Sequence, residues 1–299
     1  MIFEHSRFNS AINAGYLARD IVKNAGRGSA TAEKISIVLN EIHKSDHISS
    51  LNRISNETVK NYETYLKSAV DNKELAPHTA QSYSSAMNSI INYINLRTNK
   101  NLTKISAESL GIKNSIQYGG KSTSPELFAK VYDRLNESQQ IKQDLQRNFF
   151  LRAKESHCIK KDTIETALKS GILKLNDKNN DGTKNSRYRA VELRTEAQRN
   201  ALIRALDYMN THNQKSLIEN DKKYKQAQSK YYRDIRAAGG TKANNNGNNF
   251  SHGNRHAGLN NLATELESAG ISREEIDKNI NAVAGHGESR TTDIYLGKH

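Results

Sequence analysis

The C-terminal stretch, residues 248–299, reads NNFSHGNRHAGLNNLATELESAGISREEIDKNINAVAGHGESRTTDIYLGKH and carries the most specific pattern in the chain. It begins with an H-x-x-R box, His252–Arg255. A Gly-His pair, Gly285-His286, follows an apolar helical segment, and Tyr295 lies nine residues beyond His286 in a T-x-x-Y motif. A single H-x-x-R pair arises by chance on many basic helices. The three motifs in this order and at this spacing form a much stronger signal.

This pattern resembles the tyrosine recombinase (phage integrase) family. The resemblance implies a mainly α fold, in which a helical core-binding (SAM-like) domain precedes a mixed α+β catalytic domain with a small antiparallel sheet. It also implies site-specific cleavage and rejoining of DNA through a covalent 3′-phosphotyrosyl intermediate, as in DNA integration by mobile genetic elements. No metal, ATP or other cofactor is expected in this chemistry.

Length and composition fit two helical domains. The chain has 299 residues, which corresponds to about two domains of roughly 100–200 residues each. It has only two prolines and 35% hydrophobic residues, and its mean hydropathy is −0.81, so we expect small domains with much solvated surface. Gly119-Gly120 and the Ser/Thr residues after them break the helical periodicity. We therefore predict an N-terminal DNA-binding domain at 1–118, a linker at 119–124 and a catalytic domain at 125–299.

The charge of the chain points to a polyanionic partner. The net charge is +13, of which residues 1–120 contribute +4 and the remainder +9. Both parts are basic, which favours a nucleic acid held between two domains, because neutralising phosphates dominates nucleic-acid affinity. The alternative is a basic protein whose charge serves only solubility.

Other features of the sequence concern the compartment. Cys158 is the only cysteine, which excludes an internal disulfide and a cysteine zinc cluster and suits a reducing compartment. The first residues do not read as a secretory signal, and no run of 18 apolar residues predicts a membrane span. We expect a protein of the bacterial cytoplasm, associated with the nucleoid.

The N-terminal part reads as a set of helices. A short helix is expected at Ala11–Asn24, and three longer segments between residues 29 and 112 carry apolar residues at helical spacing. The third of these starts at Pro77, which suits a first helical turn. A short fourth helix is expected at Ser106–Leu110. This stretch resembles the core-binding domain of the family, and by itself it also fits a generic helical bundle.

The catalytic domain is expected to open with two helices, Pro125–Asn136 and Glu137–Phe150, the first capped by Ser124. Arg152-Ala153-Lys154-Glu155 then resembles the family segment in which an arginine is followed three residues later by an acidic residue. The alternative is a surface arginine paired with Glu155 at helical i,i+3 spacing.

A β-hairpin is expected next. Gly171–Leu175 and Arg187–Leu193 read as two short strands joined by a polar, Gly-containing loop. The family places a catalytic lysine in such a hairpin, often about five residues before an R-x-V motif. Lys184 lies five residues before Arg189-Ala190-Val191 and is the candidate that the resemblance selects over the other lysines nearby.

An amphipathic helix at Glu196–His212 precedes a basic segment with interleaved tyrosines, residues 215–236. A basic helix of this kind could lie along DNA phosphates, or it could be a solvated helix packed by its tyrosines. The DNA-binding candidates in this segment are Lys222, Lys223, Lys225, Lys230 and Arg233.

The resemblance assigns roles in breaking a phosphodiester. Tyr295 would attack phosphorus and carry the DNA. Arg152 and Arg255 would bracket the phosphate with planar forks, for which lysine is a poor substitute. Lys184 would protonate the leaving 5′ oxygen.

Three further residues would assist this reaction. His252 would assist proton transfer, and His286 would hydrogen-bond the phosphate. Glu155 would orient its neighbours. His256 competes with His252 on one helical face, and the H-x-x-R box selects His252.

The expected partner is double-stranded DNA with inverted-repeat core sites, bound by a homotetramer that forms from monomers on DNA, with accessory DNA-bending or directionality factors. Only residues 296–299 follow Tyr295. Many family members carry a further helix there that couples the active sites, so residues 1–28, the tyrosine segment or a longer natural chain would replace it. Alternatives to a recombinase are a type IB topoisomerase and a DNA-binding protein on the same scaffold without catalysis.

Overall fold

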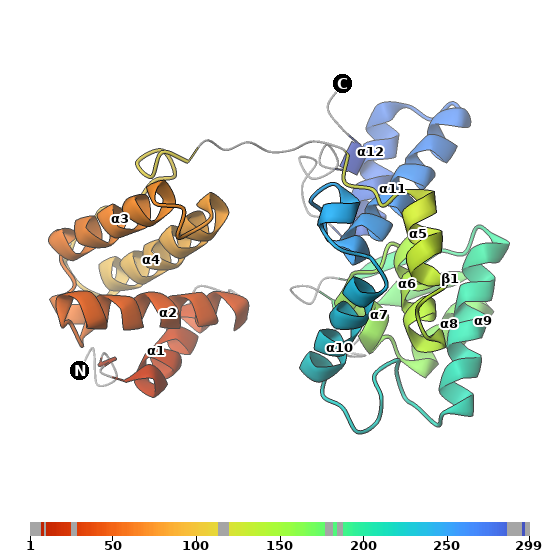
Figure 1. Ribbon diagram of the computed structural model, residues 1–299, viewed down its shortest axis with the longest axis horizontal. Coiled ribbons are helices and arrows are strands. Elements are labelled where there is room, and N and C mark those ends of the chain that lie inside the picture. The colour runs from red at the N-terminus through yellow and green to blue at the C-terminus, as the bar shows by residue number, and fades with distance from the viewer. Residues whose placement is uncertain are drawn as a thin grey trace. The chain divides into compact units, whose positions relative to one another are not determined.

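The computed structural model describes residues 7–8, 10–24, 29–112, 120–176, 182–183, 188–285 and 295–296. The chain contacts divide it into two compact units, Met1–Ser115 and Ile116–His299 (Figure 1). The fold is mainly α with one small antiparallel sheet, as the sequence predicts. The linker at 119–124 stays a prediction, since residues 113–119 lie outside the described ones. Among the described helices, none is long and apolar enough to cross a bilayer.

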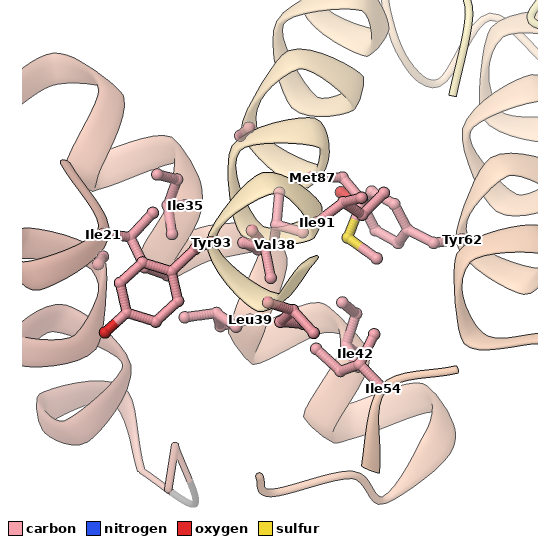
Figure 2. Packing of buried hydrophobic residues seen from close by; sticks show 14 of the residues in the cluster. Ile21, Ile35, Val38, Leu39, Ile42, Ile54, Tyr62, Met87, Ile91 and Tyr93 are labelled. Carbon is pink, nitrogen blue, oxygen red and sulfur yellow. The ribbon is translucent and has the colours of Figure 1, made fainter. Parts of the chain in front are cut away.

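The first unit is a bundle of helices. Its helices are α1 (Ala11–Asn24), α2 (Ser29–Asp46), the 3₁₀ helix η1 (Leu51–Arg53), α3 (Asn56–Asp71) and α4 (Pro77–Arg97). Helix α3 begins at a capping box in which the Ser55 side chain accepts from the Thr58 backbone, and Pro77 occupies the first turn of α4. Figure 2 shows the apolar side chains of α2 and α4 meeting in its core.

The predicted helix at Ser106–Leu110 is wrong. Residues 101–106 have no regular secondary structure, and residues 107–111 form a turn that Gly111 ends with φ of +67°. Two asparagines of α4 account for this path, because each exchanges two hydrogen bonds with the passing backbone. Asn88 does so with Ile105, at 2.8 and 2.9 Å, and Asn95 with Leu102, at 3.0 Å for both. These amides hold the backbone of Leu102 and Ile105 against α4.

The second unit holds the remaining elements. These elements are α5 (Pro125–Tyr132), α6 (Glu137–Asn148), α7 (Ala153–Cys158), α8 (Lys161–Ser170), β1 (Ile172–Leu175), β2 (Arg189–Glu192), α9 (Glu196–Thr211), α10 (Tyr224–Ala237), η3 (Ala243–Asn245), α11 (Phe250–Ser268) and α12 (Arg273–Ala284). Several of the helices begin at a local cap. Ser124 caps α5 as predicted, and Asn136 and Thr195 form capping boxes at α6 and α9. The predicted hairpin is confirmed, with Leu173 opposite Val191.

The basic segment 215–236 is helical only from Tyr224 onward. Its first residues pair with the chain ahead of α8 instead. Ser216 forms a β-bridge with Lys160, and the backbone N–H of Lys161 donates to the carbonyl of Lys215 at 3.3 Å. These main-chain bonds fix the start of the segment in a non-helical path.

Helix α11 packs directly against α6 at Gly258. A Cβ atom there would lie 1.9 Å from the carbonyl oxygen of Arg147 and 3.0 Å from the Phe150 ring. Since Arg147 O is a backbone atom, an alanine would force the two helices apart.

Gly258→Ala should therefore destabilise the second unit by about 3 kcal/mol. This corresponds to a melting temperature lower by roughly 6–12 °C, measured by circular dichroism. Gly15→Ala in α1 is the matched control, because nothing lies within 4 Å of the Cβ it would add. A Gly258→Ala protein that melts like the wild type would show that the two helices are not packed this closely.

Candidate active site

The turn between α6 and α7 sets the position of Arg152. Helix α6 ends at Asn148, and Phe150 adopts a left-handed conformation with φ of +57°. Such a φ is strained for a bulky residue. The guanidinium of Arg189 stabilises it by donating to the carbonyls of Phe149 and Phe150 at 3.1–3.2 Å. The chain then enters α7 with Arg152 as its N-cap residue.

Glu155 is a fully buried carboxylate that joins two arginines. Its oxygens accept from the backbone N–H of Arg152 at 2.6 Å and from Arg152 Nη1 at 2.8 Å, and Arg189 Nη2 lies 3.4 Å away. Burial alone would raise the pKa of Glu155, but Arg189, Arg152 and Arg255 together hold it below its usual range. Burial lowers the pKa of Arg189 to about 9. At pH 7 both groups are therefore ionised, and Glu155 locks the Arg152 side chain in place.

Arg152 and Arg255 converge on one backbone oxygen. Arg255, on α11, is 1% exposed and donates from Nη2 to the carbonyl of Ala284 at 2.6 Å. Arg152 donates from Nη2 to the same oxygen at 3.0 Å. Ala284 is the last residue of α12, which Gly285 ends with φ of +65°. The carbonyls at a helix C-terminus lack intrahelical partners and favour cations, so this end holds two like charges side by side.

Around the Ala284 carbonyl, the described residues place three arginines, Arg152, Arg189 and Arg255, near one carboxylate, that of Glu155. Burial lowers the pKa of Arg255, and the charge of Arg152 lowers it further. The buried Nε–H of Arg255 has no hydrogen-bond acceptor among the described residues. An unpaired buried donor costs about 1–3 kcal/mol. An anion with several acceptor oxygens would satisfy this arrangement.

Tyr295 reaches the same place from the C-terminal part of the chain. Its side chain is 4% exposed and belongs to the second core. Tyr295 lines a cavity of about 560 Å³ together with residues in or next to α7, α10, α11 and α12, namely Leu151, Arg152, Ala153, Lys154, Tyr224, Gln228, Tyr232, Asn249, Ser251, His252, Arg255 and Gly285. A tyrosine, a histidine and two arginines thus share one cavity, although residues 152 and 295 are far apart in sequence.

His252 lies on the exposed side of this cavity, one helical turn from Arg255. Partial burial, and then the charges of Arg255, Lys121 and Arg152, lower the pKa of His252 to about 4. Water screens part of this effect because the residue is exposed. The imidazole is neutral at pH 7 and can accept a proton.

The sequence analysis assigned no role in the site to two residues that the structure places there. His256 is fully buried and its ring centroid lies 4.3 Å from that of Tyr295. Its place on the face of His252 was visible as i,i+4 spacing, but its contact with Tyr295 depends on the fold. Arg189 appeared in the sequence only as a marker for Lys184, and the structure shows it supporting Glu155 and the turn before Arg152.

Other candidates stand apart from this cavity or outside the described part of the chain. Lys184 and His286 lie outside the described residues. Among the DNA-binding candidates of the basic segment 215–236, Lys222 pairs with Glu219, Lys230 with Asp234 at 3.3 Å, and Arg233 with Asp234 at 3.5 Å. Lys223 and Lys225 are exposed.

The tyrosines of the basic segment are partly explained by packing. Tyr231 is 1% exposed, and its hydroxyl accepts from the side-chain amides of Gln143 and Gln146 at 2.6 and 2.7 Å. Tyr224 and Tyr232 line the cavity. Among the described residues, no three His, Cys, Asp or Glu side chains gather closely enough to hold a metal ion.

His157 is a buried histidine that does not line the cavity, and its ring lies 4.8 Å from that of Tyr231. Burial, and then the charge of Lys142, lower its pKa to about 3. The pKa of His157 in the folded protein is below its unfolded value of about 6.5. Below pH 6.5 the unfolded chain therefore binds a proton that the folded protein does not, and the free energy of unfolding falls. The second unit should lose about 2 to 3 kcal/mol from this residue between pH 6.5 and 4.5.

His157→Phe should remove this fall in the free energy of unfolding between pH 6.5 and 4.5, which urea unfolding at a series of pH values measures. His212→Phe removes an exposed histidine and is the control. Equal acid slopes for the wild type and His157→Phe would contradict the prediction.

Comparisons with known proteins bear on the fold. No protein-family model and no curated protein sequence matches the chain. A crystal structure of the XerH site-specific recombinase bound to difH substrate, in its pre-cleavage complex, matches with a TM-score of 0.59 at 18% identity, over 97% of this chain and 81% of that one. A lambda integrase dimer bound to a COC′ core site matches with a TM-score of 0.60 at 13% identity, over 94% and 93% of the two chains.

A third solved structure agrees with these two. It is the Tn1549 transposon integrase in complex with circular intermediate DNA, with a TM-score of 0.57 at 13% identity, over 96% of this chain and 95% of that one. These three structures share their architecture with nearly the whole of this chain. The protein therefore has the fold of the tyrosine recombinases and integrases.

Proposed function

We propose that this protein is a site-specific tyrosine recombinase of the integrase type, which cuts and rejoins DNA through a covalent 3′-phosphotyrosyl intermediate. The observation that carries the proposal is the convergence of Arg152 and Arg255 on the Ala284 carbonyl, beside Tyr295 and His252 in one cavity. The fold shared with DNA recombinases supports it.

The two arginines would bind the phosphate that is cleaved. A guanidinium offers parallel N–H donors that match phosphate oxygens, so two such forks can stabilise the charge of a pentacoordinate phosphate. Glu155 fixes one fork through the 2.8 Å bond to Arg152 Nη1. The Nε–H of Arg255, for which the described residues supply no acceptor, is a further donor ready for an oxygen. Electrostatic stabilisation that is organised in advance usually contributes more to such catalysis than any other effect.

Tyr295 would be the nucleophile. Its phenol oxygen would bond to phosphorus as the bond to the 5′ oxygen breaks. The phenol proton would pass to neutral His252, and Lys184 would protonate the departing 5′ oxygen. His286 would hydrogen-bond the phosphate. The assignments of Lys184 and His286 rest on sequence spacing alone.

The covalent intermediate explains why ATP is not needed in this proposal, and the two arginines would offset the phosphate charge that a metal would otherwise offset. A phenol has a pKa of about 10 and is a reasonable leaving group. A DNA hydroxyl can therefore attack the phosphotyrosine and restore a phosphodiester, with the bond energy kept in the protein–DNA link. This reversibility suits strand exchange.

The partner would be double-stranded DNA with inverted-repeat core sites, bound by four copies of a chain that is monomeric in solution, with accessory factors that bend DNA or set direction. The net charge of +13 supports a DNA partner. Of the basic candidates in or next to α10, Lys223, Lys225 and Arg233 are exposed and are therefore the best placed for phosphate contacts.

A nicked suicide duplex tests the proposal. Its core sequence would first be selected by binding from a pool of duplexes with randomised cores. Cleavage next to the nick releases a short strand that diffuses away, so the covalent protein–DNA adduct accumulates. We expect an adduct resistant to detergent, formed with EDTA and without ATP. Binding without any adduct would favour a non-catalytic DNA-binding protein, and relaxation of plasmids without site preference would favour a type IB topoisomerase.

A further inference from the structure

His256 is a buried residue that the proposed mechanism does not use. It lies on α11 four residues after His252, so the two rings share one face of the helix. His256 is 0% exposed and cannot reach DNA from the solvent. Its Nε2 lies 3.0 Å from Nε2 of His252, with the ring planes at 83°. On its other side the ring lies 4.3 Å from the Tyr295 ring, centroid to centroid, at 41°.

The contact between the two imidazoles constrains their protons. Two ring nitrogens at hydrogen-bond distance need one N–H and one lone pair between them. If His256 supplies the N–H, then His252 carries its own proton on Nδ1. If His256 supplies the lone pair, then His252 is protonated on Nε2, and its Nδ1 is an acceptor. The state of His256 thus decides which nitrogen of His252 can take up a proton.

A neutral His252 at pH 7 makes this choice important. Its depressed pKa means that the tautomer governs its chemistry, because a neutral imidazole accepts protons at only one nitrogen. Since Nε2 of His252 is engaged with His256, only Nδ1 is left to act in the cavity that His252 lines.

We propose that His256 is a positioning residue of the strand-cleavage reaction: it accepts a hydrogen bond from Nε2 of His252, which leaves Nδ1 of His252 as the proton acceptor, and it packs the Tyr295 ring beside this base. This inference rests on the proposed function. His256 acts through His252 and Tyr295 and touches neither the phosphate nor the leaving group. One buried ring thereby couples the nucleophile to its base.

Three variants separate the two contacts. His256→Phe keeps a ring against Tyr295 and removes the hydrogen bond. His256→Gln keeps an acceptor oxygen and removes the ring. The combination of His256→Phe with His252→Ala tests whether His256 acts through His252. His157→Phe is the matched control, because His157 is also 0% exposed but does not line the cavity.

The experiment measures single-turnover cleavage of the nicked duplex, DNA affinity and melting temperature for each full-length protein. His256→Phe should cleave about 10²-fold more slowly, with unchanged affinity, and His256→Gln should retain more activity than His256→Phe. In the His252→Ala background, His256→Phe should change the rate by less than about threefold, because residues that act as a unit are not additive. His157→Phe should cleave at the wild-type rate.

Cleavage by His256→Phe at the wild-type rate would overturn the inference. It would also be overturned if the rate losses of His256→Phe and His252→Ala multiplied in the double variant. A glutamine variant slower than the phenylalanine variant would also overturn it, by assigning the role to the ring alone. If the wild-type protein forms no adduct, the proposed function fails and this inference fails with it. A normal wild-type adduct combined with an active His256→Phe defeats only the inference.

Discussion

Replacing Tyr295 by phenylalanine is expected to abolish the covalent protein–DNA adduct while leaving the affinity for DNA unchanged. The substitution removes only the hydroxyl. The ring stays buried in the second core and in contact with His256, so the fold should be retained. Loss of a nucleophile should lower the cleavage rate on the order of 10⁴-fold or more. Single-turnover cleavage of the nicked duplex measures the rate, and a gel-shift titration measures affinity.

Tyr232→Phe is the matched control, because Tyr232 is a second tyrosine that lines the same cavity. It should form the adduct at close to the wild-type rate. An adduct that survives Tyr295→Phe and disappears in Tyr232→Phe would transfer the nucleophile to α10 and contradict the assignment.

Arg255→Lys should have the second largest effect, a loss of about 10²–10³-fold in cleavage, by analogy with the removal of one oxyanion-hole donor. Lysine keeps the charge but not the fork that can hold Ala284 and a phosphate oxygen together. The slower cleavage should persist at saturating DNA, since the lost interaction strengthens in the transition state. Arg152→Lys should behave similarly, because Arg152 reaches the same oxygen.

Arg204→Lys is the control for these arginine variants. Arg204 donates to the Tyr132 hydroxyl and to Gln140 and does not line the cavity. Melting temperatures would confirm that each variant is folded. Cleavage by folded Arg255→Lys at the wild-type rate would show that the fork has no role in stabilising the transition state.

Local signals in the sequence predicted much of the fold. The capping residue Ser124, and Pro77 in a first turn, set helix starts that the structure confirms. The alternation in the β1–β2 hairpin likewise reflects a local period of two. These features act over a few residues, so a single sequence contains them.

Long-range contacts account for what the sequence missed. The segment around Ser106 is not helical because Asn88 and Asn95 of α4 bind the backbone of the residues before the turn. The start of α10 is displaced by pairing with Lys160 and Lys161. Neither partner can be inferred from the periodicity of the segment itself.

The candidate site likewise contains residues that local spacing predicts and residues that only long-range contacts bring together. Spacing along the C-terminal stretch singled out His252, Arg255 and Tyr295, and these lie around one cavity. Arg152 was compatible with an ordinary i,i+3 ion pair, and the structure contains that pair together with the bond to Ala284. The contacts of Arg189, and the contact of His256 with Tyr295, join residues from different elements, so no local pattern could reveal them.

The identity of the residue that carries the DNA is the most direct test of Tyr295 as the nucleophile. The wild-type adduct with the nicked duplex would be digested with trypsin and nuclease, and the nucleotide-bearing peptide sequenced by mass spectrometry. We expect a nucleotide joined by its 3′ phosphate to Tyr295. A nucleotide on any other residue, or a link through a 5′ phosphate, would contradict it.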